Sequence, residues 1–230
     1  MISNQKGFTL IEILVALVIV ALAFTAFVGS PFTSNERSKL SDSIARVQRI
    51  IKLAQDESIL QNKITRIRFT RDEDNEEEVL MEIGVASSSE ILLLESIDTS
   101  KLDRKEFEAY EEKLKEQNAS FTPIEDDIDQ KDLKIIDPIS FLGIGLPEKK
   151  ELIQNEIDIF FFPSGEKDMA VIYLMNQKEI AQIQIDSFQV HTDYTFITSI
   201  FDPEENPNKN SFDFQLERAQ KIFKRWREKF

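Results

Sequence analysis

The chain has 230 residues, a formal net charge of −14, one histidine and no cysteine. This length allows one modest domain with appendages, and the negative charge argues against a general affinity for nucleic acid. Without cysteine, and with His191 as its one imidazole, the chain cannot build disulfides, thiolate metal sites or the usual nucleophilic triads. We therefore expect neither an enzyme nor a protein with a cofactor.

A long apolar segment lies near the N-terminus. From residue 8 to residue 28 the polar residues are Thr9, Glu12 and Thr25. A helix of this length spans about 30 Å, which predicts a single membrane-spanning helix over residues 8–28. A secretory signal peptide would have a shorter apolar run and a cleaner cleavage site. A plain anchor would leave Glu12 unexplained, because a carboxylate in hydrocarbon is costly unless it is paired or lies near the interface.

The stretch Lys6-Gly7-Phe8-Thr9-Leu10-Ile11-Glu12, followed by this apolar helix, resembles the processing site of type IV prepilins and type II secretion pseudopilins. The resemblance implies a leader of residues 1–7 with Lys6 as its basic residue. A prepilin peptidase would cut between Gly7 and Phe8, and Phe8 would become the methylated N-terminus. It also implies that Glu12 neutralises the Phe8 amine of a neighbouring subunit, while Leu10 begins the apolar surface that packs on neighbouring helices.

The orientation of the predicted span follows from charge. Lys6 lies on the short N-terminal side, so the positive-inside rule places the leader in the cytoplasm and the rest of the chain outside it. By the resemblance, the membrane is the inner membrane of a Gram-negative bacterium and the C-terminal domain lies in the periplasm. The implied partners are prepilin peptidase, other pseudopilins and the inner-membrane assembly platform.

Residues 29–62 are predicted to continue the helix after an interruption at Gly29-Ser30-Pro31. Either Ser34 or Asn35 is the expected N-cap. The apolar stripe is wide enough to pack on a sheet and consists of Leu40, Ile44, Val47, Ile51 and Ala54.

Residues 63–202 are predicted to form a β-rich domain. Segments 64–70 and 77–85 are rich in strand-forming residues and should pair. The acidic run between them is interpreted as a solvated hairpin loop, with a calcium loop as the alternative, although its spacing matches no EF-hand.

Residues 87–150 are interpreted as an acidic insertion with a helix over about 102–117. Within it, Asp126, Asp127, Asp129 and Asp132 could hold a hard cation such as calcium, and a solvated acidic surface is the alternative.

Strands are predicted in segments 156–163, 170–176, 178–188 and 189–197, which together indicate antiparallel sheet. Residues 44–69, a helix running directly into a strand, and residues 159–174, with a Phe-x-Pro-x-Gly turn, resemble H-type minor pseudopilins (GspH) and FimT/FimU minor pilins. This resemblance implies an α+β, pilin-like fold in which a long N-terminal helix packs on a C-terminal antiparallel β-sheet domain.

Residues 203–230 are predicted to be a C-terminal extension, a linker followed by a basic amphipathic helix. Its apolar face consists of Leu216, Ala219, Phe223, Trp226 and Phe230. The helix could dock on its own domain, or it could bind another pseudopilin through Arg218, Lys221, Arg225 and Trp226. Anionic lipid or DNA is the remaining alternative.

The resemblance implies a structural role, as a minor pseudopilin in the pseudopilus of a type II secretion system, near its tip. The alternative in the same class is a minor type IV pilin for pilus priming or DNA uptake. A membrane-anchored binding domain is the alternative from another class, and cleavage elsewhere than after Gly7 would favour it.

Overall fold

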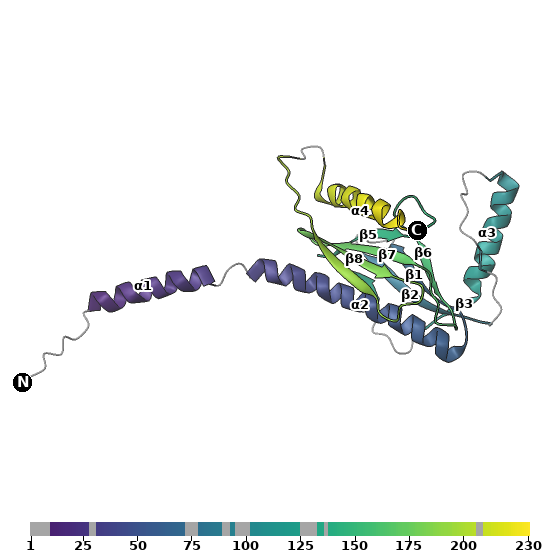
Figure 1. The fold of residues 1–230 in the computed structure, drawn as a ribbon, viewed down its shortest axis with the longest axis horizontal. Coiled ribbons are helices and arrows are strands. Elements are labelled where there is room, and N and C mark those ends of the chain that lie inside the picture. The colour runs from purple at the N-terminus through teal and green to yellow at the C-terminus, as the bar shows by residue number, and fades with distance from the viewer. Residues whose placement is uncertain are drawn as a thin grey trace, which may run out of the picture.

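A computed structural model describes the chain over residues 10–27, 31–71, 78–88, 93–94, 102–124, 133–135, 138–205 and 209–230, with the backbone alone for 21–27 and 31–35. It is an α+β protein in which N-terminal helices precede two antiparallel sheets (Figure 1). The predicted fold class is therefore confirmed.

Two helices lead into the domain, α1 (Leu10–Phe27) and α2 (Pro31–Gln61). Figure 1 shows α1 extending away from the domain, while α2 lies along the sheets. The expected N-cap at Ser34 or Asn35 is wrong, because α2 already begins at Pro31. Proline suits a first helical position, since its fixed φ fits the helix and an N–H there would have no helical acceptor.

The first sheet has the order β3-β2-β1-β6, with β4 also paired to β2. Its strands are β1 (Thr65–Arg71), β2 (Val79–Ala86), β3 (Phe121–Pro123), β4 (Lys134–Ile135) and β6 (Ile157–Phe161). The predicted pairing of segments 64–70 and 77–85 is confirmed, because β1 and β2 are antiparallel without a shift in register. β6 pairs with the other side of β1, so it is not in the same sheet as the strand that follows it.

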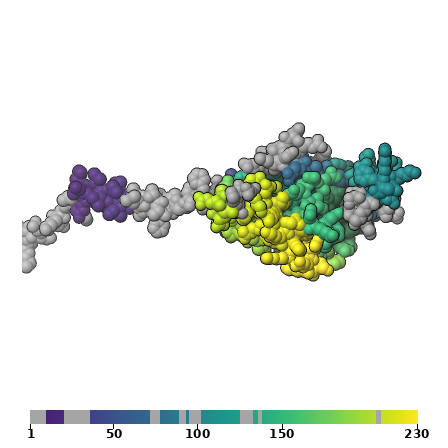
Figure 2. Space-filling model, turned by 90° about the horizontal axis from the view of Figure 1, so that it is seen from above, coloured from purple at the N-terminus to yellow at the C-terminus, as the bar shows by residue number. Residues whose placement is uncertain are grey.

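The second sheet has the order β5-β7-β8-β9. Its strands are β5 (Ser140–Gly145), β7 (Ala170–Met175), β8 (Glu179–Ile185) and β9 (Asp193–Thr198). β5 lies inside the region interpreted as an insertion, yet its residues from 141 to 145 are buried. The insertion therefore does not extend to residue 150. The helix predicted within it is confirmed as α3 (Arg104–Ala119), which projects at the end of the domain farthest from α1 (Figures 1 and 2).

The main core lies between α2 and both sheets. The predicted stripe of α2 is confirmed, because each of its five side chains is at most 1% exposed. These side chains form one apolar cluster with residues of β1, β2, β5, β6, β7 and β8. α2 thus joins the two sheets along one continuous face.

A second core lies on the opposite face of the second sheet, under α4 (Ser211–Arg227), which is yellow in Figure 2. Ala219, Phe223 and Trp226 pack there against Val171 and Tyr173 of β7. All six residues of β7 are buried, because α2 covers one face of the strand and α4 the other. This explains why β7 has a continuous apolar sequence instead of an alternating one.

Gly145 allows α4 to pack this closely. A Cβ added there would lie 2.3 Å from Cδ2 and Cε2 of Phe223. We expect Gly145→Ala to lower the free energy of unfolding by about 1–3 kcal/mol, because the ring must move out of a packed core. Urea denaturation would measure this. The same substitution should cost clearly less in a Phe223→Ala background, and an equal cost in both backgrounds would contradict the account.

Candidate assembly site

The apolar surface of α1 is exposed on every side. Each side chain described there, from Leu10 to residue 20, is exposed, with Leu10 at 84% and Leu17 at 67%. A helix that is apolar all round is normally covered by lipid or by other helices. Glu12 lies in the first turn of α1 and is exposed there with Leu10. The helix N-terminus is a position where backbone N–H groups favour a carboxylate.

The rest of the predicted N-terminal site lies outside the described residues. This applies to Lys6, Gly7 and Phe8. In the described part of the chain, no helix is both long enough and apolar enough to cross a membrane. The single pass over residues 8–28 therefore stays a prediction.

The candidate calcium ligands Asp126, Asp127, Asp129 and Asp132 also lie outside the described residues. Within the described ranges, no three His, Asp or Glu side chains are grouped so that they could hold a metal ion. His191 is exposed and precedes β9.

The four partner-binding candidates on α4 differ in how far they are exposed to solvent. Trp226 is 3% exposed and packs between the rings of Phe223 and Phe230, so it is a packing residue of the second core, and its assignment to a partner is wrong. Arg218 is half-buried, while Lys221 and Arg225 are exposed. Because the apolar face of α4 docks on the sheet, its basic residues Lys221 and Arg225 lie on the opposite face of the helix, toward solvent.

Lys167 is a buried residue that the sequence did not single out. It is 1% exposed, and its Nζ donates hydrogen bonds to Oε1 of Gln55 on α2, at 3.3 Å, and to the Gln189 carbonyl. Burial lowers the pKa of its ammonium group. Gln55 Nε2 also donates to the Gly165 carbonyl at 3.3 Å. Lys167 and Gln55 thus fasten the Phe-x-Pro-x-Gly turn to α2.

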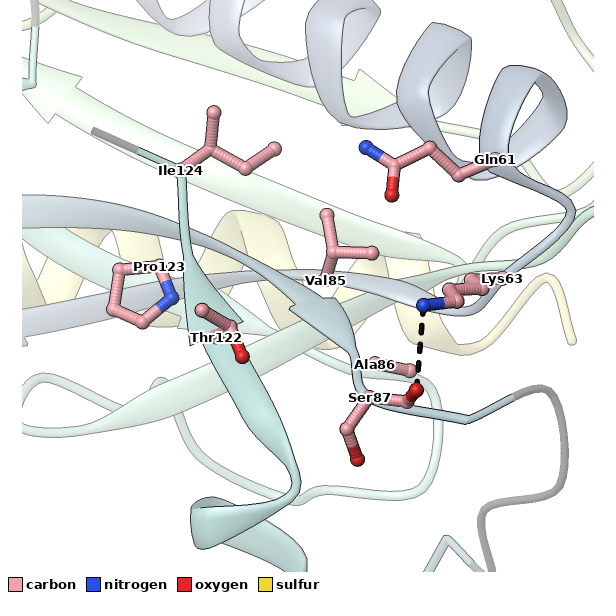
Figure 3. A pocket seen from close by; sticks show the side chains of 8 residues that line it. All are labelled: Gln61, Lys63, Val85, Ala86, Ser87, Thr122, Pro123 and Ile124. Atoms are coloured by element: carbon pink, nitrogen blue, oxygen red, sulfur yellow. Dashed lines mark hydrogen bonds between the residues drawn. The ribbon is translucent and has the colours of Figure 1, made fainter. Parts of the chain in front are cut away.

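Several shallow hollows lie on the described surface of the domain. Figure 3 shows the one beside the end of α2, where Lys63 Nζ donates to the Ser87 carbonyl at 3.3 Å. The described residues of its lining include no carboxylate and no histidine, so these residues offer no acid–base pair. A second hollow of about 320 Å³ lies near β6 and contains Asp158, Asp168 and Glu148.

Among the described carboxyl groups, Asp168 in the second hollow has the pKa that is shifted furthest from its ordinary value. Burial raises its pKa to about 6, although the Phe160 N–H donates to its Oδ2 at 2.9 Å. An unfolded aspartate ionises near pH 4, so between about pH 4 and about pH 6 the folded state holds this proton more tightly than the unfolded state does. The free energy of unfolding therefore falls as the pH rises through this range. We expect Asp168→Asn to flatten this part of the stability profile and to be more stable than wild type at pH 7. Thermal unfolding across pH tests this, with substitution of the exposed Glu151 by glutamine as the control. Parallel profiles for Asp168→Asn and wild type would contradict it.

Comparison with known protein families gives a match to the prokaryotic N-terminal methylation motif over residues 2–28. Neither a curated protein nor a solved structure matches the chain. The matched residues include the predicted cut site, Glu12 and the whole of α1. The chain therefore carries at its N-terminus the methylation motif of type IV pilins and pseudopilins.

Proposed function

We propose that this chain is a minor pseudopilin, a structural subunit of the periplasmic pseudopilus of a type II protein secretion system. The observation that carries the proposal is the methylation motif over residues 2–28, which includes α1. The described side chains of α1 are all exposed, and all but Glu12 are apolar. Motif and helix together suit a subunit that is first anchored in the inner membrane by a single pass and is then packed among other helices. In this proposal the antiparallel domain lies in the periplasm.

Prepilin peptidase removes residues 1–7 in this proposal, leaving the methylated amine of Phe8 as the N-terminus. Glu12 of one subunit then pairs with the Phe8 amine of its neighbour. Each charge offsets the desolvation cost of the other in a bundle of low dielectric constant. The exposed apolar side chains of α1, beginning at Leu10, pack against neighbouring helices.

The assignment to a minor subunit is supported by the resemblance of residues 44–69 and 159–174 to H-type minor pseudopilins. In the structure, the first segment is the part of α2 that runs into β1, and the second contains the turn fastened by Lys167. A position near the tip is part of the same proposal.

Co-purification tests the proposal. The tagged chain, extracted from membranes in mild detergent, should carry with it other pseudopilins and the inner-membrane platform of the secretion machine. Recovery with the major subunit of a type IV pilus instead would contradict the secretion role and favour a minor type IV pilin. Recovery without any pilin-like subunit would contradict both.

A further inference from the structure

β9 is the outer strand of the second sheet, and no described strand pairs with its second edge. The Ser199 N–H donates to the Lys178 carbonyl at 2.7 Å, which fixes the phase of the β8–β9 ladder. Because hydrogen-bonded pairs alternate along an antiparallel ladder, Tyr194, Phe196 and Thr198 point their N–H and C=O groups away from β8. Among the described residues, nothing hydrogen-bonds to these outward groups.

The other sheet edges are protected. Along β5, Ile144 and Ile153 exchange backbone hydrogen bonds of 2.9 and 2.8 Å. Along β6, Phe160 accepts from the Asp168 N–H at 2.9 Å and donates to the Asp168 side chain. On the remaining edge, β4 has two residues and β3 has three, of which the last is Pro123. Covering segments, short strands and proline are the devices by which proteins keep sheet edges from pairing.

β9 has none of these protective features. Its six residues, DYTFIT, include no lysine, arginine, glycine or proline, and its register with β8 is unbroken. Apolar side chains in and around it are exposed: Phe188 (78%), Val190 (62%), Tyr194 (47%) and Ile200 (66%). β9 therefore has one charged residue, Asp193 at its start, and a regular edge of this kind with apolar neighbours is typical of a strand-pairing surface.

We infer that β9 receives an extended segment of another protein subunit, which adds one further strand to the second sheet. The row of outward backbone groups is matched chemically by another peptide backbone in extended form. The side chains of Tyr194 and Phe196 lie on the α2 side of the sheet, where their rings meet edge-on at 5.6 Å and Arg37 covers Phe196 at 4.8 Å. The incoming strand therefore carries apolar residues at alternate positions on that side.

The occupant is a different subunit and not a second copy of this chain. Two β9 strands pairing antiparallel about a two-fold axis would reverse the direction of α2 in the second copy. Because α2 lies along the sheets, the two α1 helices would then point in opposite directions (Figure 1). Two such copies could not share one membrane through α1. This choice of partner rests on the proposed function, which anchors the subunits side by side.

A peptide-binding experiment tests the edge itself. The probe is a fluorescent synthetic peptide of residues 191–199 of this chain, a strand-forming segment without the anchor, titrated onto the full-length protein in detergent and followed by anisotropy. Tyr194→Pro removes one outward N–H and leaves the inward ladder intact, whereas Tyr194→Ala removes the ring and keeps the N–H. We expect the peptide to bind wild type, and to bind Tyr194→Pro about tenfold more weakly than Tyr194→Ala, with unchanged circular dichroism.

Absence of peptide binding to wild type, or equal binding to the two variants, would overturn the inference. If the purified chain is instead a dimer that Tyr194→Pro dissociates, a second copy occupies the edge and the assignment to a different subunit is wrong. The proposed function is read independently from the cut after Gly7, so its failure is distinguishable from either result.

Discussion

A chain with Glu12→Ala is expected to insert into the membrane as wild type does, but to be lost from assemblies with other pilin-like subunits. Alanine makes α1 more apolar, so insertion does not suffer. The methylated amine of a neighbour, however, then enters a bundle of low dielectric constant without its counter-charge, which costs several kcal/mol. The measurement is the amount of the variant recovered by pull-down of a second pilin-like subunit, relative to its amount in the membrane.

Val15→Ala is the matched control, because Val15 is also exposed on α1 but carries no charge. Its recovery should stay close to that of wild type. If Glu12→Ala were recovered as well as Val15→Ala, the charge-pairing account of Glu12 would be wrong.

Asp158→Ala should cause a large loss of stability in the folded domain, about 3–5 kcal/mol in the free energy of unfolding. Asp158 Oδ1 and Oδ2 accept hydrogen bonds from Arg68 Nε and Nη2 at 2.7 and 2.6 Å, and Oδ2 also accepts from Arg66 Nη1 at 3.4 Å. The side chain of Arg66 is 4% exposed and that of Arg68 is 14% exposed. Removing the carboxylate therefore leaves two guanidinium groups close together and poorly solvated. Burial lowers the pKa of Arg66, while the pKa of Arg68 is raised because its hydrogen bond to Asp158 and the nearby carboxylates outweigh burial.

Glu156 provides the comparison for Asp158. It pairs with Arg68 at 3.2 Å, but its side chain is 53% exposed. Glu156→Ala should cost less than about 1 kcal/mol, because solvent screens an exposed pair. Urea denaturation of both variants is the measurement, and similar losses would show that burial of the cluster does not govern its contribution. Loss of Asp158 should also loosen α3, since both arginines donate to Oδ1 of Asn118 in that helix.

Local periodicity predicted much of the fold because several elements present one buried face. Leu40, Ile44 and Val47 recur at helical spacing, and Ile183 and Ile185 alternate along β8, so α2 and β8 could be predicted. β5 was missed because its sequence, SFLGIG, contains two glycines and reads as a loop. Gly143 lies at a register shift with a φ of 137°, and Gly145 makes room for Phe223, so both glycines serve contacts that are distant in sequence.

The sequence did not show which strands and helices that are distant in the chain pack together. The turn between β6 and β7 has the residues of a tight connection, yet the two strands belong to different sheets, and Lys167 fastens the turn to α2. Tryptophan is a common anchor residue at protein interfaces, but Trp226 lies in the second core. The sequence could not show this, because the docking of α4 depends on the shape of the second sheet. The N-terminal methylation motif could be predicted, because its residues are consecutive in the chain.

The central claim is that the chain is processed as a pilin-like subunit, and the N-terminus of the mature protein tests it most directly. Intact mass and N-terminal fragment analysis of the chain purified from membranes should show loss of residues 1–7 and a methylated Phe8 as the first residue. An intact Met1, or a first residue other than Phe8, would contradict the account.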